Sequence, residues 1–438
     1  MKKLLLTILS VIAVLSAYPQ GAVPVKNERK KISDKALLDL VQKQSFKYFW
    51  DFGHPVSGLA RERSNGEGHK FGNEVVAIGG SGFGIMSIIV AADRKWITRD
   101  EALDKILKMV NFLDKADRFH GAFPHWLNGT TGKVIPFSVK DDGGDIVETS
   151  FLFEGLLSAR QYFHRNNDKE TLLRNEINAL WKDVDWNWYT HEQHILYWHW
   201  SPDYQFGMGH GIVGWNECLI PYVMGASSPT HAIDTSVYHQ GFARGPRFLN
   251  GKTFYDFRLP LGPDYGGPLF FTHYSFMGLD PRKLKDRYAD YWEQNTHHTL
   301  INRAYCIDNP KKYKGYGENS WGITSSYSIK GYAAHSPTRD LGVISPTAAL
   351  SAFPYTPEYS MQVLHYLYYN LGDKLWGEYG FGDAYSETAN WYSNNYLAID
   401  QGPIIVMIEN YRSGLLWKLF MSCPEIQKGL TKLDFQYN

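Results

Sequence analysis

The chain has 438 residues, and its 45 Lys and Arg are balanced by 45 Asp and Glu, so the formal net charge is zero. This balance lacks the basic excess typical of nucleic-acid-binding proteins, and it gives no electrostatic reason to expect an anionic membrane surface as a partner. With 44% hydrophobic and 15% aromatic residues, the chain can bury a large core and still present aromatic surface on which sugar rings stack.

The first residues have the pattern of a secretory signal, with two lysines followed by an apolar run from Leu4 to Ala17. The run is shorter than the ~20 apolar residues of a membrane-spanning helix. We therefore expect residues 1–17 to be a signal peptide, residues 18–31 a tail, and residues 32–438 a single periplasmic domain that does not insert into a membrane. The three cysteines are too few for a disulfide framework, so folding depends on the core.

Apolar residues at helical spacing predict about a dozen helices. The first follows Ser33, a good N-cap, and a second opens at the capping box Thr98–Glu101. Two more are predicted at Asp145–Arg165 and Asp168–Asp183. Further helical stretches are predicted to begin near Gly211, Ile233, Pro281, Thr347, Glu358 and Pro403. Pro403 suits the first helical position, where its missing N–H costs nothing.

Aromatic-rich loops lie between the helices, and two segments have the alternation of β-hairpins. They are Ala122–Ile135, around Asn128 and Gly129, and Trp186–Trp200. Many helices without a long β series fit either an α/α toroid or a superhelical solenoid. A solenoid should repeat every ~34–47 residues, and the sequence has no such period. The pattern therefore favours an all-α toroid with long loops and small β-hairpins.

Four carboxylates lie close together at a predicted loop-to-helix junction: Asp141, Asp142, Asp145 and Glu148. Asp145 and Glu148 are neighbours on one helix face, where like charges raise one pKa and leave the other group ionised. Glycoside hydrolysis needs this division between an acid and a base. Two alternatives stay open, because acidic residues also cap helices and carboxylates also bind cations, although the EF-hand spacing is absent.

Glu217 is a second candidate, because it is predicted to lie in an otherwise apolar helix between Trp215 and Cys218. Burial raises the pKa of a carboxylic acid, which suits a general acid at neutral pH. The alternative is a glutamate on a polar helix face. Nearby, six of the 14 tryptophans lie between Trp181 and Trp215, and alternating rings could pack on one face and meet a ligand on the other.

Motifs for other chemistries are absent from the sequence. It has no His-Glu-x-x-His helix or Cys-x-x-Cys pair for a metal, no Gly-x-Ser-x-Gly elbow and no Walker loop. We therefore expect neither a metal nor a cofactor.

From about Leu37 to Leu419 the chain resembles the bacterial glucoamylase-like proteins and, more closely, the β-1,2-glucanases of glycoside hydrolase family 144. The segments that carry the resemblance are Asp141–Asp145 with Glu148, Gly214–Glu217, Asp264–Gly267, Trp321–Thr324, Tyr379–Ala384, Ile399–Pro403 and Glu409–Gly414. The resemblance implies an (α/α)6 barrel and hydrolysis of β-1,2-linked glucose chains with inversion and without a metal. It implies that the acidic site residues are Asp141, Asp145, Glu148 and Glu217.

The same motifs predict where substrate binds. Six positions should converge with the acidic cluster at one end of the barrel: Arg63, His125, Trp126, Tyr265, Trp321 and Asp383. Asp383 could instead cap a helix. At least one ring should stack on a glucose unit among Trp215, Trp321 and Trp391. We expect Glu217 to be the proton donor and the base to lie within Asp141–Glu148, with the two carboxyl groups ~6.5–9.5 Å apart as inversion requires.

Two rival functions remain. A non-enzymatic glycan-binding protein would keep the aromatic surface but would need no carboxylates. Another glycosidase or a polysaccharide lyase could use the same barrel, although the acidic cluster disfavours a lyase. The expected partner is a β-1,2-linked gluco-oligosaccharide or polysaccharide, cut internally or from an end with release of sophorose, and we expect the protein to be a monomer.

Overall fold

The computed structural model describes residues 29–64 and 72–437. The described residues from Ser33 onward belong to the larger, compact unit of the chain. The predicted signal peptide, residues 1–17, and residues 18–28 of the predicted tail lie outside the described residues. All elements that position the candidate site belong to the larger unit.

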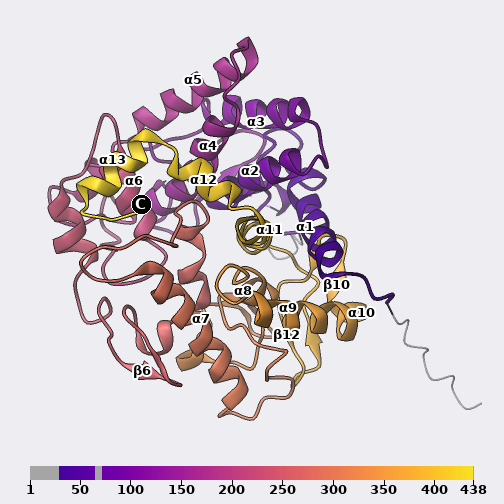
Figure 1. Ribbon diagram of the computed structural model, residues 1–438. Coiled ribbons are helices and arrows are strands. Elements are labelled where there is room, and N and C mark those ends of the chain that lie inside the picture. The colour runs from indigo at the N-terminus through magenta and orange to yellow at the C-terminus, as the bar shows by residue number, and fades with distance from the viewer. Residues whose placement is uncertain (1–28, 65–71, 438) are drawn as a thin grey trace, which may run out of the picture. The chain divides into compact units, whose positions relative to one another are not determined.

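The described part of the chain is mostly helical (Figure 1). The α-helices are α1 (Asp34–Trp50), α2 (Ile78–Asp93), α3 (Arg99–Leu113), α4 (Ile146–Tyr162), α5 (Asp168–Asp183), α6 (Leu219–Ser227), α7 (Tyr291–Asp308), α8 (Pro346–Leu350), α9 (Pro357–His365), α10 (Gly372–Leu375), α11 (Ala398–Arg412), α12 (Leu415–Met421) and α13 (Pro424–Lys432). Short 3-10 segments are η1 (Gly72–Glu74), η2 (Trp188–Thr190), η4 (Asp264–Gly266), η5 (Leu269–Thr272), η6 (Tyr274–Phe276) and η7 (Pro337–Arg339). Two π-helical segments are η3 (Val237–Phe242) and η8 (Tyr366–Asn370).

Short strands pair in small antiparallel units between the helices. They are β1 (Val75–Ala77), β2 (Trp126–Asn128), β3 (Val134–Ile135), β4 (Gly144–Asp145), β5 (His199–Trp200), β6 (Thr253–Phe254), β7 (Phe257–Arg258), β8 (Ser326–Ser328), β9 (Gly331–Ala333), β10 (Trp376–Gly377), β11 (Gly380–Phe381), β12 (Tyr385–Ser386) and β13 (Trp391–Tyr392). β1, β2 and β3 form a three-stranded sheet, in which Trp126 pairs with Ala77 on one side and Ile135 on the other. The remaining strands pair two by two, as β4–β5, β6–β7, β8–β9, β10–β11 and β12–β13.

Several predicted elements are confirmed by their local hydrogen bonds. The Ser33 side chain caps α1, and Thr98 forms a complete capping box at the start of α3. The predicted helix at 145–165 is α4, with Asp145 as its N-cap. The predicted hairpin Ala122–Ile135 contains the β2–β3 pair. Helices α5, α8 and α9 also begin close to the positions predicted for them.

Two predicted helix starts are wrong because the chain turns before the helix begins. The stretch from Gly211 is not helical, since Gly214 has a φ of 83° that no right-handed helix contains, and α6 begins only at Leu219. The helix expected near Pro281 begins at Tyr291, where Asp290 accepts hydrogen bonds from the first free backbone N–H groups.

Two further predictions are corrected by tertiary pairing. Trp186–Trp200 is not a hairpin, because β5 pairs with β4, so that His199 lies opposite Asp145. Pro403 lies inside α11 rather than at its first position. It therefore removes one backbone hydrogen bond of α11, a defect that the burial of this helix tolerates.

The core is organised around α2, α4 and α11, which are buried along almost their whole length. Helix α2 packs on α4, and the two lie side by side in Figure 1. Sequence patterns do not predict α2, because four of its first seven residues are glycine, and each glycine costs about 0.5–1 kcal/mol relative to alanine. Close packing requires them: a Cβ on Gly82 would lie 2.0 Å from the Phe151 carbonyl oxygen, and one on Gly155 would lie 2.2 Å from the Gly82 carbonyl oxygen.

Within the described residues, no helix combines the length and the apolar composition that crossing a membrane requires.

We predict that Gly82→Ala lowers the free energy of unfolding by about 1–3 kcal/mol or more, because the added methyl group forces α2 and α4 apart. Gly317→Ala is the matched control, since a Cβ there meets nothing within 4 Å, and it should change stability by less than about 0.5 kcal/mol. Chemical denaturation of both variants measures the difference. Equal stabilities would show that the helix contact yields without cost.

Candidate active site

A cavity of about 430 Å³ opens where α4 begins, a volume typical of small-ligand sites. Its walls are largely aromatic, and its charged lining consists of Glu62, Arg63, His125, Glu148 and Glu217. The apolar walls include Trp126, Phe137, Phe151, Trp198, Phe270, Tyr274 and Tyr332. The lining comes from segments far apart in the sequence, which the packing of α2, α4 and α11 brings together.

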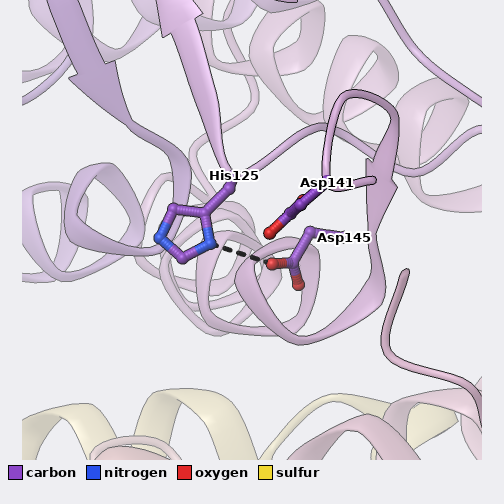
Figure 2. A group of neighbouring side chains, drawn as sticks. All are labelled: His125, Asp141 and Asp145. Carbon is purple, nitrogen blue, oxygen red and sulfur yellow. Dashed lines mark hydrogen bonds and ion pairs between the residues drawn. The ribbon is translucent and has the colours of Figure 1, made fainter. Parts of the chain in front are cut away.

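Asp145 is the anchor of the acidic cluster. It is fully buried at the junction of β4 and α4, and its Oδ1 accepts hydrogen bonds from the backbone N–H groups of Val147 and Glu148, both at 2.9 Å. Its Oδ2 lies 3.0 Å from His125 Nδ1 (Figure 2) and accepts a hydrogen bond from Trp198 Nε1 at 3.2 Å. Burial opposes ionisation, but the hydrogen bond to His125 and the charges of nearby histidines outweigh it and lower the pKa of Asp145.

His125 lies between two carboxyl groups. Its Nδ1 faces Asp145, and its Nε2 lies 3.9 Å from Glu148 Oε1. Burial alone would lower the pKa of His125, but the charges of Glu148 and Asp145 raise it to about 9. The surroundings therefore favour the positively charged form of the imidazole. A second histidine, His199, places its Nε2 3.2 Å from Asp141 Oδ2.

Glu148 lies in the first turn of α4 and points at the beginning of α2. Its Oε2 accepts a hydrogen bond of 2.7 Å from the backbone N–H of Gly79. A Cβ on Gly79 would lie 2.6 Å from that oxygen, so a larger residue there would displace the carboxyl group. Burial, followed by the neighbouring negative charge of Asp145, raises the pKa of Glu148 to about 7.

Glu217 faces the same cavity from the turn that precedes α6, not from within an apolar helix as predicted. The Ser275 hydroxyl donates a hydrogen bond to its backbone carbonyl and fixes the turn. Desolvation raises the pKa of the Glu217 side chain to about 7, with a smaller contribution from the charge of Glu148. The pocket thus holds two carboxyl groups whose pKa values burial raises to about 7.

Many of the predicted site residues come together. Five line the cavity: Arg63, His125, Trp126, Glu148 and Glu217. Asp145 contacts the lining residue His125. Asp141 contacts His199, which lies in the same cluster. Inversion requires the acid and the base to lie ~6.5–9.5 Å apart, and this separation between the Glu217 and Glu148 carboxyl groups stays a prediction.

The tryptophans predicted to stack on glucose occupy other places. Trp321 is fully buried and Trp215 is 2% exposed, so neither ring offers a face to a ligand. Trp215 instead packs against Phe242 and Tyr291. Burial of large apolar rings in the core explains both positions. The cavity is lined by Trp126 and Trp198 instead.

Three more predicted residues do not line the cavity. Tyr265 packs against Phe254, and Trp391 lies in β13. Asp383 is buried and does not cap a helix, because its Oδ2 accepts a hydrogen bond of 2.6 Å from the backbone N–H of Tyr327 in β8. The Tyr327 hydroxyl in turn accepts a hydrogen bond from Arg63, so Asp383 stands directly behind one wall of the cavity.

Sequence reasoning missed four residues of the site: Glu62, Trp198, His199 and Tyr332. Trp198 and His199 belong to the tryptophan-rich segment that was singled out, but a hairpin there would have placed them elsewhere. Only the pairing of β5 with β4 brings His199 to Asp145. For Glu62 and Tyr332, no local pattern points to the cavity.

The nearest approach to a metal site is the group in Figure 2, where one donor atom each of His125, Asp141 and Asp145 lies within 4.8 Å of the others. Both oxygens of Asp145 already accept hydrogen bonds, from two backbone N–H groups, from Trp198 and from the His125 ring. A metal held by this group would replace the hydrogen bond between His125 and Asp145. The donor set therefore fits the handling of protons better than the binding of a cation.

We predict that the imidazole of His125 stays protonated until about pH 9, because Glu148 and Asp145 stabilise the cation. Asp145→Asn retains the cap of α4 but removes the charge, and it should lower the pKa of His125 by about 1 unit or more. Asp141→Asn should lower it less, since Asp141 acts on His125 only through a weaker charge effect. NMR titration of the histidine rings, assigned with His125→Gln, gives the values. An ordinary histidine pKa in the unmodified protein would contradict the prediction.

The Glycoamylase family is matched over residues 209–424 of the chain. A solved endo-β-1,2-glucanase from Chitinophaga pinensis, in complex with sophorotriose and glucose, is 56% identical with a TM-score of 0.91, covering 93% of this chain and 99% of that chain. A solved β-1,2-glucanase from Parabacteroides distasonis is 47% identical with a TM-score of 0.89, covering 92% of this chain and 60% of that chain.

A curated relative, the exo β-1,2-glucooligosaccharide sophorohydrolase (non-reducing end) of Parabacteroides distasonis (strain ATCC 8503), is 47% identical over 425 residues, or 92% of this chain. The chain spans 58% of the length of that curated relative. The match to the Chitinophaga pinensis enzyme extends over almost the whole of both chains. The chain therefore belongs to the glucoamylase-like family, which includes these relatives named as β-1,2-glucan-degrading enzymes.

Proposed function

We propose that the protein is a glycoside hydrolase that cleaves β-1,2-linked glucose chains. The observation that carries the proposal is that two buried carboxyl groups, Glu148 and Glu217, face one cavity with aromatic walls, where burial raises the pKa of each to about 7. A glycan-binding protein would need the aromatic walls but not these acids. The names of the relatives support β-1,2-glucan as the substrate class.

Glu217 is the proton donor in this proposal. Within the described part of the chain, no cation favours the charged form of Glu217, whereas Glu148 lies 3.9 Å from the imidazole of His125 and accepts a backbone N–H. The base is therefore a member of Asp141–Glu148, and we propose Glu148 for this role. Inversion would place a water between the base and the anomeric carbon.

The wall of the cavity supplies the groups that a glucose chain needs. Aromatic side chains such as Trp126 and Trp198 line the cavity, and Arg63 offers hydrogen-bond donors for hydroxyl groups. Relatives of both endo- and exo-acting kinds exist, so the products of the reaction decide between internal cleavage and release of sophorose from an end.

Finer assignments accompany this proposal. We propose membership of glycoside hydrolase family 144, an (α/α)6 barrel for residues 32–438, a monomeric state, and a periplasmic location for the mature protein. The motifs quoted above support the first two assignments, and the lysine-led apolar run at Leu4–Ala17 supports the location.

We predict that the purified protein releases sophorose or short β-1,2-linked oligomers from linear β-1,2-glucan. Thin-layer chromatography identifies the products, and proton NMR of the first product formed should show an α-anomer if the enzyme inverts. Soluble starch and a β-1,3-glucan are the controls and should remain intact. Binding of β-1,2-glucan without any product would favour a glycan-binding protein instead.

Glu217→Gln should lower turnover by about 10²–10⁴-fold, because the amide keeps the shape of the side chain but cannot donate the catalytic proton. Affinity for the glucan, measured by calorimetry, should be retained. Glu293→Gln on the exposed part of α7 is the control and should behave like the unmodified protein. If Glu217→Gln keeps near-normal turnover, Glu148 becomes the candidate for the acid.

A further inference from the structure

Phe137 is the most exposed of the aromatic residues that line the cavity. It is 50% exposed, whereas Trp126 is 9% and Phe151 is 2% exposed. Tyr332 is exposed to a similar degree, but it carries a hydroxyl group that can hydrogen-bond to water. The side chain of Phe137 has no polar atom, so covering its exposed part with another apolar surface is favourable.

Two ring contacts hold the part of Phe137 that is not exposed. Its ring centroid lies 4.2 Å from that of His125, with the planes 32° apart, and 4.8 Å from that of Trp126, with the planes 62° apart. Trp126 and His125 both line the cavity, and His125 is the partner of Asp145. The exposed part of Phe137 therefore lies away from these two rings and is open to the cavity.

The loop that carries Phe137 is fixed at both ends. Strand β3 before it pairs with β2, and strand β4 after it pairs with β5. Within the loop, the Phe137 N–H donates to the Asp141 carbonyl oxygen at 2.9 Å, and the Asp141 N–H donates to the Ser138 carbonyl oxygen at 3.1 Å. The Asp141 carboxylate in turn contacts His199 at 3.2 Å. The ring is thus placed before any ligand binds, which lowers the entropy cost of binding.

The chemistry of a glucose ring suits this position. In β-linked glucose the hydroxyl groups point outward around the ring, so that the C–H groups form two apolar faces. One such face can cover the exposed part of Phe137. The hydroxyl groups at the edge of the sugar can then hydrogen-bond to the charged lining residues Glu62 and Arg63.

We propose that Phe137 is a substrate-binding residue that stacks on the apolar face of a glucose unit and positions that unit beside His125. It takes the role that the sequence pattern assigned to Trp215, Trp321 or Trp391. The inference rests on the proposed function for the identity of the sugar, and its geometry rests on the two ring contacts and the anchored loop.

Three variants of the loop test the role of the ring. Phe137→Ala should raise KM for β-1,2-glucan about fivefold to tenfold, the loss expected when half of a phenylalanine side chain is no longer covered, and should change kcat by less than about threefold. Phe137→Tyr keeps the ring and should keep KM within about threefold. Val139→Ala is the matched control, because Val139 lies in the same loop, is 74% exposed and is not among the lining residues. An unchanged KM in Phe137→Ala, an equal rise in Val139→Ala, or a loss confined to kcat would overturn the proposal.

A binding measurement separates this inference from the proposed function. Linear β-1,2-glucan is titrated by calorimetry into Glu217→Gln and into the double variant Glu217→Gln/Phe137→Ala. The double variant should bind about fivefold to tenfold more weakly. Equal affinities would overturn the inference even if the unmodified protein cleaves the glucan. Weaker binding by the double variant would support the inference even if the unmodified protein cleaves no glucan, a result that would contradict only the proposed function.

Discussion

The arrangement of the site depends on how one buried carboxylate, Asp145, is satisfied. An ionised carboxylate can be buried only if hydrogen bonds and opposite charges replace water. Asp145 has both, because one oxygen caps α4 and the other faces His125 and Trp198. The same bonds orient α4, hold the imidazole, and bring the tryptophan into the cavity wall. The hydrogen bonds of Asp145 thus stabilise its negative charge and also fix the start of α4.

Glycine connects the packing of the core with the chemistry of the site. Gly82 and Gly155 let α2 and α4 approach until backbone atoms touch. This approach places the first turn of α2 against the first turn of α4, so that the Gly79 N–H can bind the Glu148 carboxylate. A helix N-terminus favours negative charge. The glycines that lower the helix propensity of α2 are therefore the residues that let α2 pack on α4 and reach the Glu148 carboxyl group.

The pKa values of the carboxyl groups in the cavity are shifted by different neighbours. Glu217 keeps a proton mainly through desolvation, whereas Glu148 is also influenced by the charges of Asp145 and His125. Asp383 does not line the cavity, and it is connected to Arg63 through Tyr327. Carboxyl groups in unlike environments can perform unlike tasks, and this difference is what an acid and a base within one pocket require.

The sequence by itself determined the helical character of the chain, the caps at Ser33, Thr98 and Asp145, and the grouping of acidic residues at the start of α4, because these depend on neighbours within a few positions. It could not determine α2, whose glycines oppose a helix locally and are explained only by α4. It also could not separate core tryptophans from cavity tryptophans, since Trp321 and Trp126 have the same local chemistry and differ only in what packs over them. The tertiary structure decided these points, because burial and the pairing of β5 with β4 arise between residues that are distant in the chain.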